Sequence, residues 1–152
     1  MTDIQATRTE DGLAYELDLD ATPAEVWRYW TEPDRIVRWM GDVATLEPWP
    51  GGTFRIEYAS GDVVAGAFVD VEEPQYLAFT WGWDEPGALT PPGSTRVEVT
   101  LEGLANDTRT RLRMGHTNQP AEALDNHDAG WRFFLPTLVS ALDYPDGGRP
   151  PT

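Results

Sequence analysis

A change in the spacing of apolar residues constrains this chain more than any other feature of its sequence. Across residues 42–116, apolar and polar residues alternate in six short segments separated by turns rich in Gly, Pro, Asn and Asp. Beyond them the spacing becomes helical, with Leu124, Trp131 and Leu138 repeating every seven residues. Alternation buries one face of a strand, and a seven-residue repeat buries one stripe of a helix. The pattern therefore predicts a sheet and one long helix that cover each other.

Shorter elements precede the six segments. The alternation across 13–19 predicts a strand, and Thr22 followed by Pro23 predicts a capped helix that Pro33 interrupts before a second short helix at 34–40. The six later strands are expected near Val43–Trp49, Thr53–Ala59, Asp62–Val71, Tyr76–Trp83, Thr95–Glu102 and Thr108–His116, and the long helix at Pro120–Leu142. The expected architecture is α+β, in the order β-α-α-β6-α, with a curved antiparallel sheet wrapped around the C-terminal helix.

Two details of these elements lead to specific expectations. For the hairpin around 103–107, Glu98 opposite Arg113 gives one charged and one apolar face. Its charged face then carries a row of arginines, interpreted as a solvated surface rather than an anion site: Arg109, Arg111 and Arg113. In the long helix, Gly130 predicts a close approach of the backbone to another segment, and Pro136 predicts a kink.

Composition excludes several classes of function. Acidic residues outnumber basic ones 26 to 11, and the resulting net charge of −15 repels nucleic acids and anionic membranes. Without cysteine there is no disulfide or thiolate site, and two histidines without a suitably spaced third ligand make a poor metal site, so neither metal nor cofactor is expected. The polar start of the chain and its short apolar runs predict no signal peptide and no membrane span, which favours a cytoplasmic protein.

The distribution of apolar residues also suggests the domain organisation. We expect a flexible N-terminus over residues 1–12, where no periodicity is visible, and a single domain over 13–143. The segment 144–152 is rich in Pro and Gly, which predicts a flexible tail.

An ordered set of short motifs runs through nearly the whole chain. The motifs are Ala24-Glu25-Val26-Trp27, Trp30-Thr31-Glu32-Pro33, Trp39-Met40, Gly51-Gly52-Thr53-Phe54, Gly66 before Pro74, Leu77-Ala78-Phe79-Thr80-Trp81, Thr110-Arg111-Leu112-Arg113-Met114-Gly115-His116 and Gly130-Trp131. The set resembles the helix-grip superfamily (START-like, Bet v 1-like, SRPBCC) and, within it, the family named for the activator of the Hsp90 ATPase. The resemblance implies a cavity between sheet and long helix. Such folds host ligand carriers, polyketide cyclases, co-chaperone domains and proteins that protect antibiotic producers.

Alternation along the strands indicates which side chains face that cavity. Residues 62–71 are apolar on both faces, and we favour Phe68 inward, with Gly66 making room on the same face. The candidate ligand-binding residues are Phe54, Ile56, Tyr58, Phe68, Phe79, Trp81, Trp83, Val99, Leu112, Met114, His116, His127, Trp131 and Leu135. Most of these side chains also suit a simple core, whereas several aromatics around one void would suit a planar, apolar ligand.

Three hypotheses for function follow. The first is a binding protein for an apolar or aromatic small molecule, without catalysis, because no nucleophile elbow or phosphate-binding loop is present. The second is a cyclase or hydrolase acting on a polyketide-like substrate, which needs polar groups such as Tyr58, Asp70 and His116 to converge in the cavity. The third, suggested by the family name alone, is a module that interacts with a chaperone and exposes an apolar patch.

Overall fold

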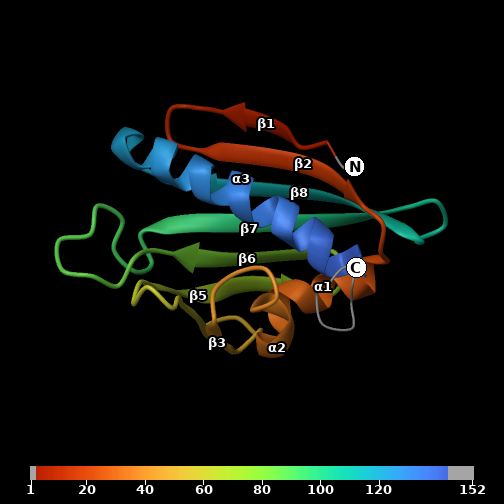
Figure 1. Ribbon diagram of the computed structural model, residues 1–152, viewed down its shortest axis with the longest axis horizontal. Helices are drawn as coiled ribbons and strands as arrows, with labels where there is room; N and C mark the ends of the chain where they lie inside the picture. The colour runs from red at the N-terminus through yellow and green to blue at the C-terminus, as the bar shows by residue number, and fades with distance from the viewer. Residues whose placement is uncertain (1–2, 144–152) are drawn as a thin grey trace.

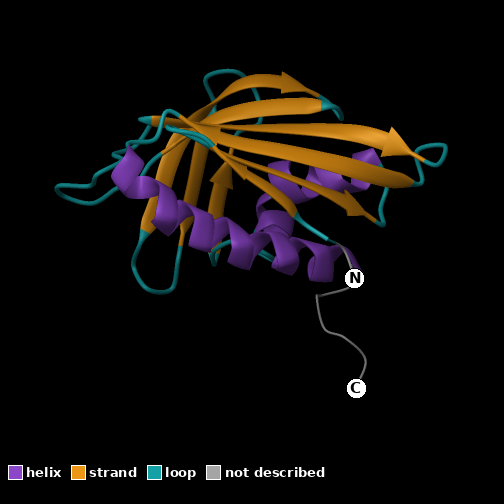
Figure 2. Cartoon of the chain, turned by 90° about the horizontal axis from the view of Figure 1, so that it is seen from above, coloured by secondary structure: helices purple, strands orange, loops and turns teal. Residues whose placement is uncertain are grey.

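A computed structural model describes residues 3–143, which form one curved antiparallel sheet and a long C-terminal helix. The eight strands lie in the order β1-β2-β8-β7-β6-β5-β4-β3. The elements are β1 (Gln5–Arg8), β2 (Leu13–Leu19), α1 (Pro23–Thr31), α2 (Pro33–Ile36), β3 (Val43–Leu46), β4 (Thr53–Glu57), β5 (Val63–Glu72), β6 (Tyr76–Trp81), β7 (Thr95–Leu104), β8 (Arg109–Thr117) and α3 (Ala121–Asp143). Helix α3 lies along the concave side of the sheet (Figures 1 and 2). The α+β helix-grip prediction is confirmed.

The structure adds a strand that the sequence pattern does not reveal. Strand β1 lies inside the segment 1–12, which we expected to be flexible, and pairs with β2 in the register Gln5↔Glu16. All four of its residues are exposed, so no apolar alternation marks it. The segment 144–152, expected to be a flexible tail, lies outside the described residues.

The first helix begins as its sequence indicates, and the second ends early. The Thr22 side chain accepts a hydrogen bond from the backbone N–H of Glu25 at 3.1 Å, which caps α1. Helix α2 ends at Ile36 rather than near Met40. After Ile36 the chain continues in tighter turns, because the N–H groups of Arg38 and Trp39 donate to the carbonyls three residues back.

The β7–β8 hairpin has the predicted faces but a different register. Arg113 lies opposite Thr100 rather than Glu98, a displacement of two residues. The turn holds only four residues, three of which have positive φ (51° at Ala105, 58° at Asn106, 63° at Asp107), so β7 extends to Leu104. A displacement of two keeps every side chain on its predicted face and changes only the partners.

The arginine row of β8 lies on the outer face of the sheet, as predicted. Its partners come mainly from β2, because β2 is the other neighbour of β8. The closest pairs are Arg109–Asp20 at 3.8 Å, Arg111–Asp18 at 2.8 Å and Arg113–Glu16 at 2.8 Å. Each arginine is partly exposed, and each has a carboxylate partner, which suits a solvated charged surface.

Within residues 3–143, no helix is both long and apolar enough to cross a lipid bilayer. Helix α3 continues through Pro136 to Asp143. Gly130 does not approach another segment: a Cβ placed there would meet nothing within 4 Å, so the close approach expected from the sequence is wrong.

Candidate functional site

The inner face of the sheet and the facing side of α3 bring a group of aromatic rings together, which we call the aromatic cluster. Its members come from α3 and from four strands, β4, β5, β6 and β8, or the residues just after them: Phe54, Tyr58, Phe68, Phe79, Trp81, Trp83, His116, His127, Trp131 and Phe134. Trp81 lies at its centre, with ring centroids 5.2 Å from Trp131, 5.7 Å from His116 and 6.1 Å from Trp83. The candidate site is therefore built from rings that are far apart in the sequence.

Strand pairing explains how β5 contributes to the cluster. Phe68 is 1% exposed and lies opposite Phe79 of β6, so its predicted inward orientation is confirmed. Gly66 has a different role from the one expected. A Cβ at this position would lie 1.9 Å from the carbonyl oxygen of Thr80, so glycine permits the close approach of the β6 backbone rather than opening space for a ligand.

His116 is fully buried, and both of its ring nitrogens have partners. The indole N–H of Trp131 donates to Nδ1 at 3.0 Å. Because an indole nitrogen only donates, Nδ1 is the acceptor and the ring proton lies on Nε2. Nε2 then donates to Thr95 Oγ1 at 2.8 Å, and the Thr95 hydroxyl donates to the Trp81 carbonyl at 2.7 Å. This chain of hydrogen bonds fixes one neutral tautomer of His116.

His127 on α3 repeats the arrangement. The indole N–H of Trp83 donates to its Nε2 at 3.1 Å, so the ring proton lies on Nδ1 and is donated to Gln119 Oε1 at 2.6 Å. The Gln119 amide donates in turn to the backbone carbonyl of His116 at 2.9 Å. The two histidines, whose ring centroids are 4.6 Å apart, thus belong to one hydrogen-bond network.

The electrostatic setting keeps both imidazoles neutral. Burial, followed by the neighbouring His127, lowers the pKa of His116 to about 2. Burial also lowers the pKa of His127 to about 4. Protonation of either ring would replace its acceptor nitrogen with a donor facing an indole N–H, which agrees with the direction of both shifts. Neither histidine is placed to act as a general acid or base near neutral pH.

Two donors of the aromatic cluster have no hydrogen-bond partner. They are the indole Nε1 of Trp81, whose side chain is 3% exposed, and the hydroxyl of Tyr58. Burial, followed by the nearby Asp62 and Asp42, raises the pKa of Tyr58 above its usual range, so the phenol keeps its proton. The Tyr58 ring packs against Trp83 at 6.1 Å and Phe134 at 5.9 Å.

The structure places nearly all of the predicted ligand-binding side chains inside. All are buried except Tyr58 and Trp83, which are half-buried. Sequence reasoning missed Thr95 and Gln119, which hold the histidine rings, and left Phe134 out of the candidates. Thr95 opens a strand and Gln119 lies between β8 and α3, and no local pattern marks either residue. Whether the predicted residues bind a ligand stays a prediction.

The polar groups considered for catalysis do not converge. Tyr58 and His116 belong to the aromatic cluster, whereas the Asp70 side chain is 54% exposed and pairs with Arg96 at 3.6 Å. The Arg96 guanidinium also lies 3.6 Å from Glu98 and donates to the Tyr76 hydroxyl. Asp70 therefore belongs to the charged outer surface.

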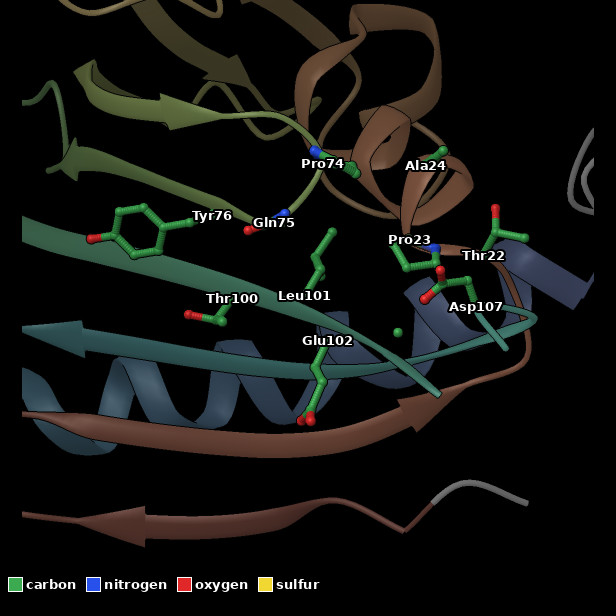
Figure 3. Close-up of a pocket in the computed structure, with 11 residues that line it drawn as sticks. Thr22, Pro23, Ala24, Pro74, Gln75, Tyr76, Thr100, Leu101, Glu102 and Asp107 are labelled. Atoms are coloured by element: carbon green, nitrogen blue, oxygen red, sulfur yellow. The ribbon is translucent and has the colours of Figure 1, made fainter. Parts of the chain in front are cut away.

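A separate pocket of about 780 Å³ lies on the outer face, beside the start of α1 (Figure 3). Tyr76, Thr100 and Glu102 line it, and these alternate along their strands with buried residues such as Leu77 and Val99. The other lining residues are Thr22, Pro23, Ala24, Pro74, Gln75, Leu101, Gly103 and Asp107. None of the predicted ligand-binding residues belongs to this pocket.

Comparisons with known proteins agree on the family and the fold. Residues 20–143 match the model of the family described as Activator of Hsp90 ATPase homolog 1-like protein. A comparison with the sequences of curated proteins gave no significant match.

Several solved structures share the fold. DynU16, from the dynemicin biosynthetic locus, superposes with a TM-score of 0.77 at 24% identity over 93% of this chain, which spans 51% of DynU16. A protein from Rhodobacter sphaeroides gives a TM-score of 0.75 at 22% identity, covering 93% of this chain and 98% of that one. CalU16 from Micromonospora echinospora gives 0.72 at 22% identity, covering 95% and 88%. At these identities the likeness shows the fold.

Proposed function

We propose that this chain, which belongs to the activator of Hsp90 ATPase homolog 1-like family, is a small-molecule binding protein that holds an apolar or aromatic ligand between the sheet and α3. The aromatic cluster is the observation that carries the proposal. Its rings face one another on the inner side of the sheet, with Trp81 and Trp131 deep inside. A set of rings with few polar atoms suits a planar ligand that gains affinity from burial and stacking.

The half-buried part of the cluster is the expected place of entry. Tyr58, Trp83 and Phe134 are the ring residues of the cluster that keep partial exposure, and the Tyr58 ring contacts the other two. A ligand entering there would displace these rings first and then reach Trp81, which packs edge-on against Trp83 at 6.1 Å. The deeper ligand contacts would be the remaining predicted residues.

The alternative functions receive less support. A cyclase or hydrolase would need Asp70 near Tyr58 and His116, but Asp70 pairs with Arg96 on the outer surface. A chaperone-binding module would need an exposed apolar patch. Among the described residues, the large exposed apolar side chains are Val43, Trp49, Leu89 and Phe133, which lie on four separate segments.

Ligand binding can be tested with a neutral fluorescent probe. We expect 1-aminoanthracene to bind with a Kd in the micromolar range and to gain fluorescence in the apolar site. Native mass spectrometry of freshly purified protein would show whether a small molecule copurifies. DynU16 comes from the dynemicin biosynthetic locus, so dynemicin belongs in the panel of further ligands, together with the polyketide-like compounds that the family resemblance suggests.

Two neighbouring phenylalanines of α3 offer a matched pair of variants. Phe134 packs against Tyr58, whereas Phe133 is 67% exposed. Phe134→Ala should weaken probe binding several-fold, and Phe133→Ala should leave it unchanged. Failure of the wild-type protein to bind any apolar or aromatic compound at micromolar concentration would refute the proposal.

A further inference from the structure

The hydrogen bonds of the aromatic cluster divide its polar atoms into two groups. The first group is saturated: each imidazole accepts from one tryptophan and donates to one oxygen, of Thr95 for His116 and of Gln119 for His127. The second group consists of Trp81 Nε1 and the Tyr58 hydroxyl, which have no partner. Buried polar groups are nearly always paired in native proteins, so each unpaired group calls for an explanation.

The two unpaired groups resemble each other in chemistry and in place. Both rings pack against Trp83, with centroids 6.1 Å from it. The indole can only donate, and the phenol is a protonated hydroxyl that also donates. A ligand that satisfies Trp81 must therefore present an acceptor, and an oxygen with free lone pairs is the usual one.

The same surroundings indicate that the acceptor is uncharged. Both histidines in the cluster are held neutral by their hydrogen bonds, so neither supplies a cation for a carboxylate or a phosphate. A charged group placed among these rings would lose its hydration without gaining an ion pair. An uncharged carbonyl oxygen meets both requirements.

We propose that the ligand is a planar, uncharged molecule with a carbonyl oxygen that accepts a hydrogen bond from Trp81 Nε1, while the Tyr58 hydroxyl provides a second donor to the same ligand. This inference rests on the proposed function and specifies the class of ligand. It assigns Trp81 and Tyr58 as the groups that select carbonyl compounds over hydrocarbons. Discrimination of this kind arises because a ligand without the acceptor leaves buried donors unpaired.

Fluorene and 9-fluorenone provide the test, because the two planar molecules have similar shapes and the second carries one carbonyl. We expect calorimetric titration of the wild-type protein to give a Kd for 9-fluorenone about tenfold lower than for fluorene. In Trp81→Phe the ratio should fall to about two or less, with fluorene binding retained. In Tyr58→Phe the ratio should fall by about threefold.

Trp30→Phe is the matched control, since Trp30 carries the other unpartnered indole N–H among the described residues. Its ring packs against Trp39 at 4.7 Å and touches the aromatic cluster at Phe79, 6.4 Å away, but has no ring contact with Trp81 or Trp83. This variant should keep the tenfold ratio. In ¹⁵N-labelled wild-type protein, the indole resonance of Trp81 should move on addition of 9-fluorenone and stay in place with fluorene, which gives a readout that does not depend on a variant folding.

The outcomes separate the two proposals. Equal affinities for the two compounds, or a ratio unchanged in Trp81→Phe, would overturn the carbonyl inference while leaving a binding protein. If neither compound binds and 1-aminoanthracene does not bind either, both the inference and the proposed function are wrong.

Discussion

The two faces of the sheet satisfy their polar groups in opposite ways. On the inner face the ring nitrogens of the aromatic cluster have one partner or none: His116 Nδ1 has only Trp131, and Trp81 Nε1 has no partner. On the outer face the partners are duplicated, since Arg113 reaches both Glu16 and Glu102. Each exposed ion pair contributes little to stability, whereas a buried polar group that loses its partner destabilises the fold, because it has also lost its hydration. A single substitution should therefore matter far more inside than outside.

The largest effect is expected at Trp131, which is 2% exposed, packs against Trp81 and donates to His116. Trp131→Ala should lower the free energy of unfolding by about 3–5 kcal/mol, as for other buried aromatic truncations. Chemical denaturation monitored by circular dichroism measures the change. A loss of only about 1–2 kcal/mol, the ordinary range for point mutants, together with weaker ligand binding, would indicate that Trp131 lines a cavity rather than the core.

The next effect concerns the hydroxyl of Thr95, which links His116 Nε2 to the Trp81 carbonyl. Thr95→Val keeps the shape and leaves both groups unpaired, so stability should fall by about 1–3 kcal/mol. Thr100→Val on the exposed side of the same strand is the control, with an expected change within about 0.5 kcal/mol. Equal effects of the two substitutions would contradict the contrast between the faces.

Stability should also depend on pH through the two histidines. Their folded-state pKa values, about 2 for His116 and about 4 for His127, lie below the ordinary value of 6.5. Below pH 6.5 the unfolded chain therefore binds protons that the folded protein does not bind, and the free energy of unfolding falls as the pH falls. From pH 6.5 to 5.5 each histidine should contribute a loss of about 1 kcal/mol.

Denaturation curves across this range measure the slope, before the carboxylates titrate. His127→Gln should halve it, because one of the two groups is removed. A flat profile between pH 5.5 and 6.5 would mean that both rings bind protons in the folded state as they do in the unfolded chain.

The smallest effect is expected beside Trp131, at Gly130, where a Cβ would meet no other atom within 4 Å. Gly130→Ala should raise the free energy of unfolding by about 0.5–1 kcal/mol, because alanine restricts the unfolded chain and favours the helix. Thermal melting checks the sign. A destabilised variant would show that the backbone of α3 needs glycine here.

Local patterns predicted the strands because alternation identifies a face independently of the partner strand. In the strand of Phe68 both faces are apolar, so alternation alone did not decide the orientation, and the structure confirms the inward placement that we favoured. The hairpin register was wrong by two residues for the same reason: faces survive such a displacement, and only the turn at Ala105–Thr108 selects the partners. Strand β1 has four exposed residues, so it carried no signal at all.

The sequence predicted which aromatic rings form the candidate site, but it did not predict the hydrogen bonds that connect them. Alternation and the helical stripe nominated Trp81, His116 and Trp131, which the structure brings together. The roles of Thr95 and Gln119 could not be predicted, because polar residues next to strand ends are common and no local pattern distinguishes these two.

By itself, the sequence determined which side chains face inward, where the first helix is capped, and that one long helix must cover a sheet. These properties depend on the neighbours of a residue within a few positions of the chain. Tertiary structure alone decided which polar atoms of the aromatic cluster are satisfied. Thr95 meets His116 from 21 positions away and Trp83 meets His127 from 44. Hydrogen bonds act only at contact distance. The tertiary fold therefore determines which atoms are partners and which two donors have none.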